Sequence, residues 1–276
     1  MADERALSGY AQAAQAAVDE AREIFLAELG AAPALFKGPG DFATAADLAI
    51  EKLLRTRLEA ETGVTVYGEE QGGNLDPRAC WVVDPIDGTS NYSSGNPNCA
   101  ILVALLLDGQ PAAAVVDAPL LGMRLTAVEG GPVALNGETL PPLGATSAAA
   151  PQVGMGSLAS LDRRRFPSIV RLALAGALAE EGLRPRISGS VGVDLAFVAQ
   201  GIYRAAVSFS PHVWDNAAGV LLGRCAGATV TAGDGSAWAP GKVGAIVGTP
   251  DAHGAVLRIL RGAEKDPEKD AEEERR

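Results

Sequence analysis

The chain of 276 residues is 47% apolar and 21% charged, with a formal net charge of −11 and a pI near 4.7. Its length permits one large globular domain or two smaller ones, and its acidity argues against nucleic acids or anionic membranes as partners, because both attract basic surfaces. It has neither a basic segment leading into an apolar one at its start nor an uncharged apolar run of about 18 residues, so we expect a cytoplasmic protein outside the membrane.

Residues 1–143 are expected to form an N-terminal α+β domain. Apolar residues at helical spacing predict a helix over 10–29. The segment FKGPGDFAT is expected to be a linker into a second helix over 45–61. Thr44 and Asp47 make a variant of the capping box at the start of that helix.

The rest of this half is predicted to be a sheet. A short strand lies in VTVYGEEQGG, and an apolar strand over 80–83 runs into Asp84. Three further strands between residues 99 and 131, the first two joined by an Asp-Gly turn, have the pattern of an antiparallel meander. We therefore expect two helices packed on an antiparallel sheet.

Composition shifts over 140–152, where Pro, Gly, Ser and Ala accumulate, and we place a domain boundary there. Residues 144–263 are predicted to form a C-terminal α/β domain. Residues 264–276 lack apolar periodicity and are expected to be a disordered acidic tail. Helices are predicted at 167–182, 191–200, 214–227 and 251–261, and strands near 153–157, 184–190, 203–209, 228–231 and 243–248.

Acidic side chains stand at the boundaries of several of these elements. In the stretch DPIDGTSNY, Asp84 leaves a buried strand, Pro85 interrupts its ladder, and Gly88 turns the chain. One carboxylate at such a turn is more often a solvated turn residue than a ligand for a hard cation. The ligand interpretation gains weight because acids recur at element boundaries at Asp47, Glu69, Glu70, Asp87 and Asp215.

Shared ligation of metal ions would give these acids a common purpose. The turn at Gly88 is expected to bring Asp84, the Ile86 carbonyl and Asp87 around one concavity. Oxygen-only ligands favour Mg²⁺, Mn²⁺ or Ca²⁺, and this number of acids suits two ions, which is an arrangement that supports phosphoryl transfer. The N–H groups of Gly88 and Thr89 can then bind phosphate oxygens, while the Thr89 hydroxyl orients a water.

Four motifs resemble the inositol monophosphatase family in order and spacing: DFATAADLAIEKLL, GEEQGG, DPIDGTSNY and HVWDNAAG. The similarity covers roughly residues 8–262 and is greatest to members from actinobacteria. It implies a layered α-β-α-β-α sandwich, of the type shared with fructose-1,6-bisphosphatase. It also implies a homodimer, sensitivity to Li⁺, and dependence on two to three Mg²⁺ ions, with Mn²⁺ as a possible substitute.

The resemblance also implies roles for individual residues. Glu69, Asp84 and the Ile86 carbonyl would hold the first ion, Asp84, Asp87 and Asp215 the second, and a third would bind more weakly near Glu69. Thr89, hydrogen-bonded to Asp47, would position the attacking water, so Asp47, Thr89 and Glu69 are the expected catalytic residues. No covalent phosphoenzyme is expected.

The alcohol-binding side departs from the family pattern. Members acting on inositol phosphate often carry a Glu where this chain has Ser208, which puts inositol itself in doubt. Gly189, Ser190, Val191 and Ser157 are expected to line the alcohol pocket, with Asp87 and Asp215 also facing the substrate. The Ser190 hydroxyl suits a sugar hydroxyl or a helix cap equally well.

Other polar residues have structural interpretations. His212 is expected to pack at a strand end, and His253 to face solvent. The run at 163–165 of three arginines is expected to be a solvated face, although it could meet a substrate phosphate.

The sequence thus predicts a Mg²⁺-dependent phosphatase of a small phosphorylated alcohol, with myo-inositol 1-phosphate as the first candidate. Histidinol phosphate and fructose 1,6-bisphosphate are alternatives within the fold, and a 3′-phosphoadenosine nucleotide is the least favoured. A catalytically silent dimeric scaffold is the alternative from another class. The sequence does not identify the oligomer interface or a role for the acidic tail.

Overall fold

The computed structural model describes residues 4–38, 41–144, 150–160 and 165–265. The expected disordered tail, 264–276, is wrong at its first two residues, because the last helix extends to Lys265; its remaining residues, 266–276, lie outside the described part. No helix in these ranges is both long and apolar enough to span a bilayer.

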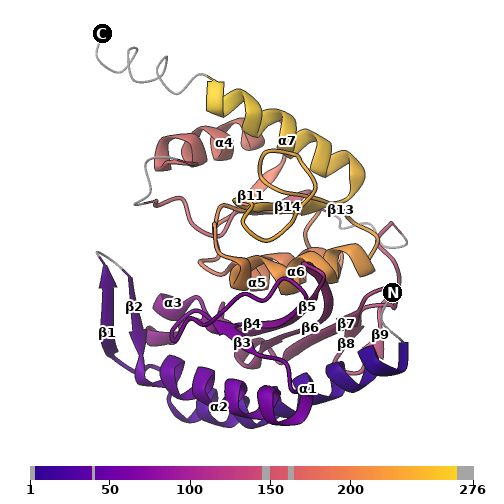
Figure 1. Cartoon of the computed structure of the whole chain (residues 1–276). Coiled ribbons are helices and arrows are strands. Elements are labelled where there is room, and N and C mark those ends of the chain that lie inside the picture. Colours follow the sequence, from indigo (N-terminus) through magenta and orange to yellow (C-terminus); the bar gives the residue numbers. More distant parts are fainter. Residues whose placement is uncertain (1–3, 39–40, 145–149, 161–164, 266–276) are drawn as a thin grey trace.

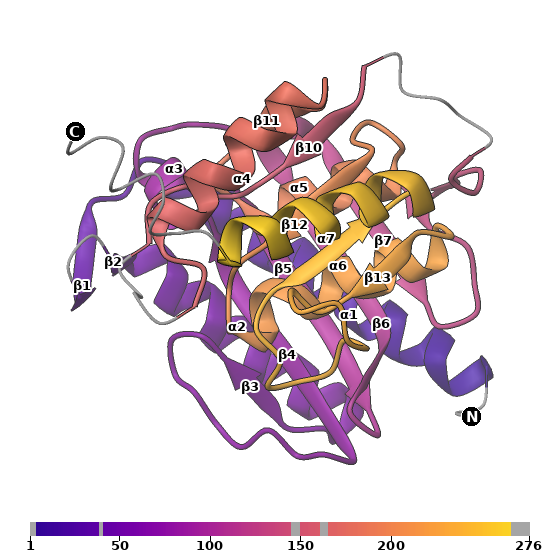
Figure 2. The same ribbon diagram turned by 90° about the horizontal axis from the view of Figure 1, so that it is seen from above.

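Five layers of secondary structure make up the molecule, which confirms the expected α-β-α-β-α sandwich (Figure 1). Helices α1 (Glu4–Ala27) and α2 (Ala45–Thr62) cover one face of a seven-stranded sheet. Helices α5 (Val191–Ala199) and α6 (Val213–Cys225) lie between that sheet and a five-stranded one. Helices α4 (Ser168–Glu180) and α7 (Pro250–Lys265) run side by side over the outer face of the smaller sheet (Figure 2).

The seven-stranded sheet contains the predicted antiparallel meander. Its order is β3-β4-β5-β6-β7-β8-β9, and only β3 and β4 pair in parallel. Asp108 and Gly109, both at positive φ, form the predicted two-residue turn between β5 and β6. The strands are β3 (Val66–Gly68), β4 (Ala79–Asp87), β5 (Ala100–Leu107), β6 (Gln110–Ala118), β7 (Met123–Val128), β8 (Ala134–Leu135) and β9 (Glu138–Thr139), with a 3₁₀ turn at Pro119–Leu121.

Strand β4 differs from the prediction at its end. We expected Pro85 to stop the ladder, but β4 continues to Asp87, which pairs with Ala100. The register shifts between Asp84 and Asp87, so an irregularity in the strand accommodates the proline. A helix of one turn, α3 (Thr89–Ser93), follows directly and was not predicted.

The five-stranded sheet is built only from residues of the C-terminal half. Its order is β11-β10-β12-β14-β13, with parallel pairs at β10 and antiparallel pairs at β14. The buried core beneath it joins residues of both halves, because α5 and α6 pack against the larger sheet as well. The domain boundary at 143/144 stays a prediction. The strands are β10 (Gln152–Gly154), β11 (Arg184–Arg186), β12 (Ala205–Ser208), β13 (Thr229–Thr231) and β14 (Ala245–Gly248).

The start of α2 confirms one sequence prediction, and the segment before it corrects another. Thr44 and Asp47 form the reciprocal capping box, and Gly63 ends the helix in the left-handed conformation. The expected linker is instead a two-stranded hairpin of β1 (Pro33–Gly38) and β2 (Asp41–Thr44). A hairpin outside both main sheets has no alternating buried face, which explains why its sequence resembles a linker.

His253 is a further correction. It is only 5% exposed, and its Nε2 lies 2.9 Å from the Thr231 hydroxyl, so it does not face solvent as expected. His253 lies near the start of α7, which packs over β13 and β14, and the Thr231 hydroxyl on β13 contacts its ring.

Close packing of α6 against α5 generates a stability prediction. A Cβ atom at Gly219 would lie 2.4 Å from Leu195 Cδ1, whereas one at Gly176, on the exposed side of α4, would meet nothing within 4 Å. We expect Gly219→Val to lower the free energy of unfolding by about 1–3 kcal/mol through overpacking. Gly176→Ala should leave it unchanged or raise it by up to about 1 kcal/mol. Urea denaturation of both variants measures the difference, and equal effects would contradict the packing argument.

Candidate active site

Asp87 lies where the end of β4 meets the start of α5. Its carboxylate accepts hydrogen bonds from the Ser190 hydroxyl at 2.5 Å and from the backbone N–H groups of Val191 and Gly192 at 3.3 and 2.6 Å. These donors and the helix N-terminus hold a negative charge in a place that water barely reaches. Burial nevertheless raises the pKa of Asp87 to about 6 against the effect of these donors.

Asp84 lies three residues before Asp87 on β4 and is 2% exposed. Its Oδ1 accepts the N–H of Ile86 at 3.1 Å. Burial, followed by the charges of Glu69, Asp87 and Asp215, raises the pKa of Asp84 well above its ordinary value. The structure therefore brings together four of the predicted metal ligands, which come from three separate motifs.

Asp215 reaches the same place from the first turn of α6. Burial and the charge of Asp87 raise the pKa of Asp215 to about 8, and the Ser210 hydroxyl only partly offsets this rise. Like charges held together in a poorly hydrated space favour protonation or the entry of a cation.

Asp47 and Thr89 meet as predicted. The Thr89 hydroxyl lies 3.2 Å from Asp47 Oδ1 and 3.0 Å from the Ile86 carbonyl oxygen. The other carboxylate oxygen of Asp47 accepts the backbone N–H and hydroxyl of Thr44, which fixes its orientation. Burial raises the pKa of Asp47, and the Thr44 and Thr89 hydrogen bonds oppose this rise.

Gly88 begins α3 at a φ of +84°, in the left-handed region. A Cβ atom there would lie 2.9 Å from the Asn98 carbonyl oxygen and 3.2 Å from that of Gly189. Glycine is therefore required both by the turn and by the close approach of the 188–190 loop. The first N–H groups of a helix have no partner inside it, so those of Gly88 and Thr89 suit an anion.

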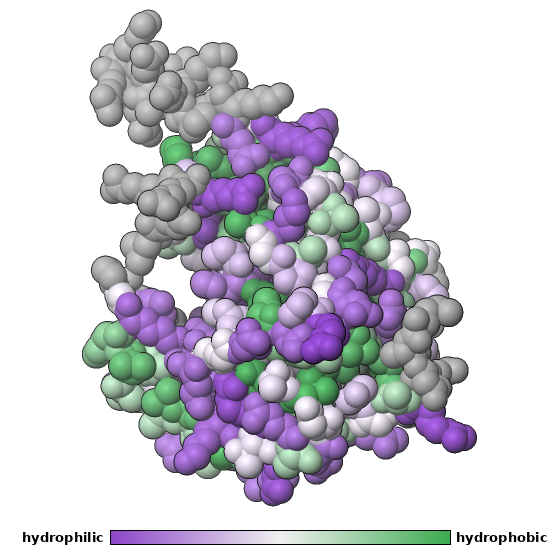
Figure 3. Space-filling model, viewed as in Figure 1, coloured by the Kyte–Doolittle hydropathy of each residue, from purple (hydrophilic) through white to green (hydrophobic). Residues whose placement is uncertain are grey.

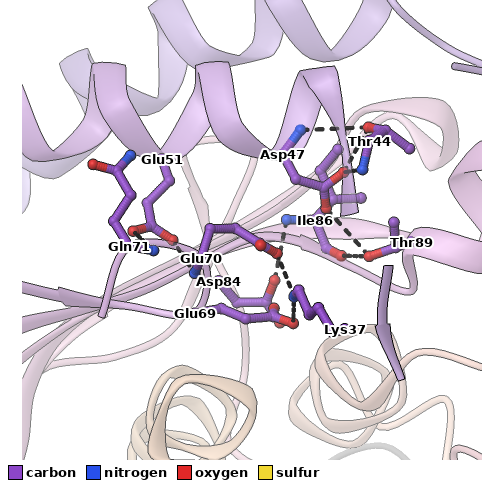
Figure 4. Close-up of polar contacts among 10 residues, drawn as sticks. All are labelled: Lys37, Thr44, Asp47, Glu51, Glu69, Glu70, Gln71, Asp84, Ile86 and Thr89. Carbon is purple, nitrogen blue, oxygen red and sulfur yellow. Dashed lines mark hydrogen bonds and ion pairs between the residues drawn. The ribbon is translucent and has the colours of Figure 1, made fainter. Parts of the chain in front are cut away.

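Glu69 and Glu70 directly follow β3, and both carboxylates bind the side chain of Lys37. The Lys37 ammonium donates to Glu69 Oε1 at 2.7 Å and to Glu70 Oε1 at 2.6 Å (Figure 4). Burial lowers the pKa of Lys37, but the hydrogen bonds and charges of the two glutamates outweigh it and the net pKa is raised. Burial raises the pKa of Glu70 to about 7 despite this contact.

The donor set suits a hard divalent cation, because its ligands are carboxylate and carbonyl oxygens. Among the described residues, no three Asp, Glu, His or Cys side chains are already closed around one ion-sized point. Glu69 is instead bound by the Lys37 ammonium. The residues fit such an ion, because the negative charges of Glu69, Asp87 and Asp215 raise the pKa of Asp84. Lys37 donates its hydrogen bonds to Glu69 and Glu70 rather than to the aspartates.

A cavity of about 430 Å³ adjoins the site through Val191 and Ser210, which bind Asp87 and Asp215. Of the residues expected to line the alcohol pocket, Ser157 and Val191 are at its wall, together with Ser210 and His212. The arginine run, expected to be a solvated face, contributes Arg165 to the wall, whereas 163 and 164 fall outside the described residues. His212 stacks on Trp214 at 4.6 Å between ring centroids.

Two predicted substrate residues are used inside the protein. The Ser190 hydroxyl caps α5 by accepting the Val193 N–H at 3.2 Å and donates to Asp87, so the helix-cap interpretation describes it. Ser208 is 1% exposed, and its hydroxyl accepts the Ser210 N–H at 3.2 Å. Gly189 packs against Asn91, where a Cβ atom would lie 2.8 Å from Nδ2.

Sequence reasoning missed three residues that organise the site. Lys37 lies in the supposed linker, and Glu51 lies on α2 and binds the backbone after Glu69. Asn91 donates to the carbonyls of Asn98 and Ser188, which ties the 188–190 loop to α3. Asn91 stands inside the DPIDGTSNY motif and Glu51 one turn after Asp47, and these positions are the signals that could have revealed them.

Three comparisons relate the chain to known proteins. The profile of the Inositol monophosphatase family matches residues 4–265. The chain is 46% identical over 256 residues to the probable inositol 1-monophosphatase ImpA of Mycobacterium tuberculosis, which covers 92% of this chain and 94% of that protein. It is 39% identical over 264 residues to the inositol-1-monophosphatase ImpA of Mycolicibacterium smegmatis, covering 95% and 96%. The crystal structure of extragenic suppressor protein suhB from Bartonella henselae superimposes with a TM-score of 0.80 at 26% identity, over 94% of this chain and 99% of that one.

The Lys37 contact predicts competition between its ammonium and a divalent cation for Glu69. We expect Lys37→Met to tighten Mn²⁺ binding by about two- to fivefold, since a partly exposed ion pair contributes up to about 1 kcal/mol. Calorimetric titration with Mn²⁺ measures the change. Lys52→Met, which removes the same charge from an exposed position of α2, is the matched control. Weaker binding by Lys37→Met would show that Lys37 supports the ion rather than opposing it.

The raised pKa values predict how stability changes with pH in a chelator. Asp215 has a pKa near 8 in the folded protein against an ordinary 3.8, so the folded state binds more protons than the unfolded state between these values. Its contribution is therefore most favourable below about pH 4 and is lost as pH rises through about 8.

In urea denaturation with EDTA, wild type should lose more stability between pH 5 and pH 8 than Asp215→Asn does. We expect the difference to exceed about 1 kcal/mol, given that one pKa unit corresponds to about 1.4 kcal/mol. Added Mg²⁺ should reduce this loss in wild type. Identical pH profiles for the two proteins would refute the assignment of this repulsion to Asp215.

Proposed function

The chain belongs to the inositol monophosphatase family and is a phosphatase of phosphate monoesters, and from this premise we propose a substrate and a mechanism. We propose that it releases inorganic phosphate from a small polyol phosphate, with myo-inositol 1-phosphate as the first candidate, in a reaction that requires Mg²⁺. The observation that carries the proposal is the convergence of Asp84, Asp87 and Asp215, since the charges of Asp87 and Asp215 raise the pKa of Asp84 and that of Asp87 raises the pKa of Asp215.

The residues proposed to hold the ions are those that the resemblance indicates. Glu69, Asp84 and the Ile86 carbonyl would take one ion, and Asp84, Asp87 and Asp215 a second, while a third would bind more weakly near Glu69. Bound there, Mg²⁺ supplies Lewis acidity that makes a water more acidic and neutralises charge on the phosphate. Mn²⁺ has similar ligand preferences and is expected to substitute.

Thr89 and Asp47 are proposed to orient the attacking water. The single proton of the Thr89 hydroxyl can go to Asp47 Oδ1 or to the Ile86 carbonyl, at 3.2 and 3.0 Å. If the Ile86 carbonyl serves as a ligand, the proton goes to Asp47. The lone pairs of Thr89 Oγ1 can then accept a hydrogen bond from water.

The phosphate is proposed to sit against the N–H groups of Gly88 and Thr89. These groups start α3, and fixed N–H donors stabilise an oxyanion without having to reorganise during the reaction. Gly88 also leaves room for the Gly189 carbonyl, so the proposed anion site packs directly against the 188–190 loop.

The pocket wall helps to order the candidate substrates. Arg165 and Arg171 both line it, and their positive charge is unfavourable for the ammonium group of histidinol phosphate. The hydroxyls of Ser157 and Ser210 suit polyol oxygens. Fructose 1,6-bisphosphate remains the alternative that this charge favours, and Ser208, being internal, supplies no direct contact to a sugar ring.

A catalytically silent scaffold is the second candidate function. The superimposed suhB structure carries the name of an extragenic suppressor, so the fold also occurs under a name that states no phosphatase activity. The presence of all five acids and Thr89 in one site favours catalysis in this chain. Both functions are compatible with the cytoplasmic homodimer that we propose, which sedimentation velocity would reveal.

We predict phosphate release that is strictly dependent on Mg²⁺, inhibited by Li⁺, and fastest with inositol 1-phosphate. The measurement is inorganic phosphate released from inositol 1-phosphate, fructose 1,6-bisphosphate, histidinol phosphate and 3′-phosphoadenosine 5′-phosphate, with Mg²⁺ or EDTA. Turnover of histidinol phosphate alone would contradict the proposal that inositol 1-phosphate is the substrate. No turnover of any compound, with Mg²⁺ still bound, would favour the scaffold.

Asp84→Asn supplies the matched test of the site. Removing one of several mutually repelling charges should raise the stability of the metal-free protein at pH 8, while activity falls by about 10²-fold or more because the loss acts on the transition state. Asp76→Asn, a change of the same charge in the loop before β4, should alter neither quantity. Retained activity in Asp84→Asn would exclude Asp84 as a ligand.

A further inference from the structure

We propose that Glu51, which lies on α2 outside the ligand set, is the positioning residue for Glu69. Its carboxylate fixes the turn that presents Glu69 to the divalent-ion site. The inference rests on the proposed function, because it takes Glu69 as a ligand, and its test keeps the two separate.

The Glu51 carboxylate binds the backbone directly after Glu69. It is fully buried, and its two oxygens accept the N–H groups of Glu70 at 2.6 Å and of Gln71 at 2.9 Å (Figure 4). A buried carboxylate is costly unless it has strong donors, and two backbone N–H groups supply them. The next two peptides are thus held, which limits the directions in which Glu69 can point.

The turn is shaped around this carboxylate. A bond from Gly68 N–H to the Gly72 carbonyl, at 3.0 Å, closes the loop over it. A Cβ atom at Gly68 would lie 2.3 Å from the Glu51 carboxyl carbon, so only glycine leaves space for the contact. Arg55, one helical turn after Glu51, donates to the carbonyls of Val66 at 2.5 Å and Gly72 at 2.8 Å. Both ends of the turn are therefore fastened to α2.

The same helix also fixes Thr89, through Asp47. Asp47 and Glu51 are four residues apart and thus share one face of α2, the helix that packs on β3 and β4; Figure 4 shows Asp47 beside Thr89 and Glu51 beside Glu70. One rigid element sets Glu69 relative to Thr89, that is, an ion ligand relative to the residue proposed to orient water. Glu51 is therefore proposed to position Glu69 relative to Thr89, and not only to stabilise the turn.

Glu51→Gln tests the inference because it keeps the size of the side chain. An amide offers one acceptor oxygen and an NH₂ group to two N–H donors, so one of the two bonds is lost. We expect the dissociation constant for Mn²⁺, measured by calorimetry, to rise about 10- to 100-fold, as for other residues that orient ligands. The half-saturating Mg²⁺ concentration should rise in parallel, with little change in kcat at saturating Mg²⁺.

Gly68→Ala gives an independent test that leaves Glu51 in place. Its added Cβ should displace the carboxylate and weaken Mn²⁺ binding in the same way, and the double variant with Glu51→Gln should be no weaker than the single ones. If Glu51→Gln does not fold, as judged by circular dichroism, Gly68→Ala still decides the question.

Glu59→Gln is the matched control. Glu59 lies two turns further along α2, and it accepts the Val66 N–H at 3.1 Å and lies 3.7 Å from Arg55, but it does not touch the turn after Glu69. It should leave Mn²⁺ affinity unchanged even if it lowers thermal stability. Wild-type affinity in both Glu51→Gln and Gly68→Ala, or equal weakening by Glu59→Gln, would overturn the inference. Failure of wild type to bind Mn²⁺ would instead sink the proposed function.

Discussion

Repulsion between buried carboxylates is the constraint around which this structure is organised. Asp84 and Asp87 are buried and Asp215 is half-buried; the charges of Asp87 and Asp215 raise the pKa of Asp84, and that of Asp87 raises the pKa of Asp215. Such an arrangement costs free energy in the metal-free protein, so the surrounding fold must impose it. It does so with helix N-termini: α5 donates two N–H groups to Asp87, and Asp215 sits in the first turn of α6. The middle helical layer therefore serves the larger sheet's core and the acidic site at once.

The placement of the site follows from that layered construction. Strand β4 belongs to the N-terminal sheet, and α5 and α6 come from the C-terminal half, so the acids converge only where the two halves pack. Helix α2 adds a third support from the opposite face of the sheet, through Asp47 and Glu51. Close contacts at Gly88 and Gly192, where added Cβ atoms would meet a backbone carbonyl and Leu102, show how little freedom is left. A site of like charges needs this rigidity, because flexible ligands would simply move apart.

Much of this could be predicted from the sequence, for reasons that differ between residues. The capping box of α2, the Asp-Gly turn and the meander follow from local patterns, and the structure contains all three. The meeting of Asp47 with Thr89 rested on the family resemblance, since 42 residues separate them and no local pattern links them. Lys37 was missed because its hairpin packs on neither main sheet, and the apolar Leu35 and Phe36 beside it are exposed, as the apolar patch on the hairpin in Figure 3 shows. Glu51 resembled an ordinary helix acid because its side-chain partner, Arg55, is a common i,i+4 neighbour, and its other partners are backbone N–H groups that side-chain composition does not reveal.

The contacts of the serines explain why the alcohol part of the substrate is harder to predict from the sequence than the metal-dependent reaction. Ser190 and Ser208 were expected at the pocket, but both hydroxyls have partners inside the protein. The Ser190 hydroxyl donates to Asp87 and caps α5, and the Ser208 hydroxyl accepts the backbone N–H of Ser210. The polar residues at the wall come from loops, among them Ser157, Ser210 and Arg165, although the Ser210 hydroxyl also binds Asp215. Loop positions can change without disturbing the strands and helices that hold the acids. Substrate choice and metal chemistry are therefore separable in this fold, and the substrate should be sought in the charge and hydroxyl groups of the wall rather than in the acidic motifs.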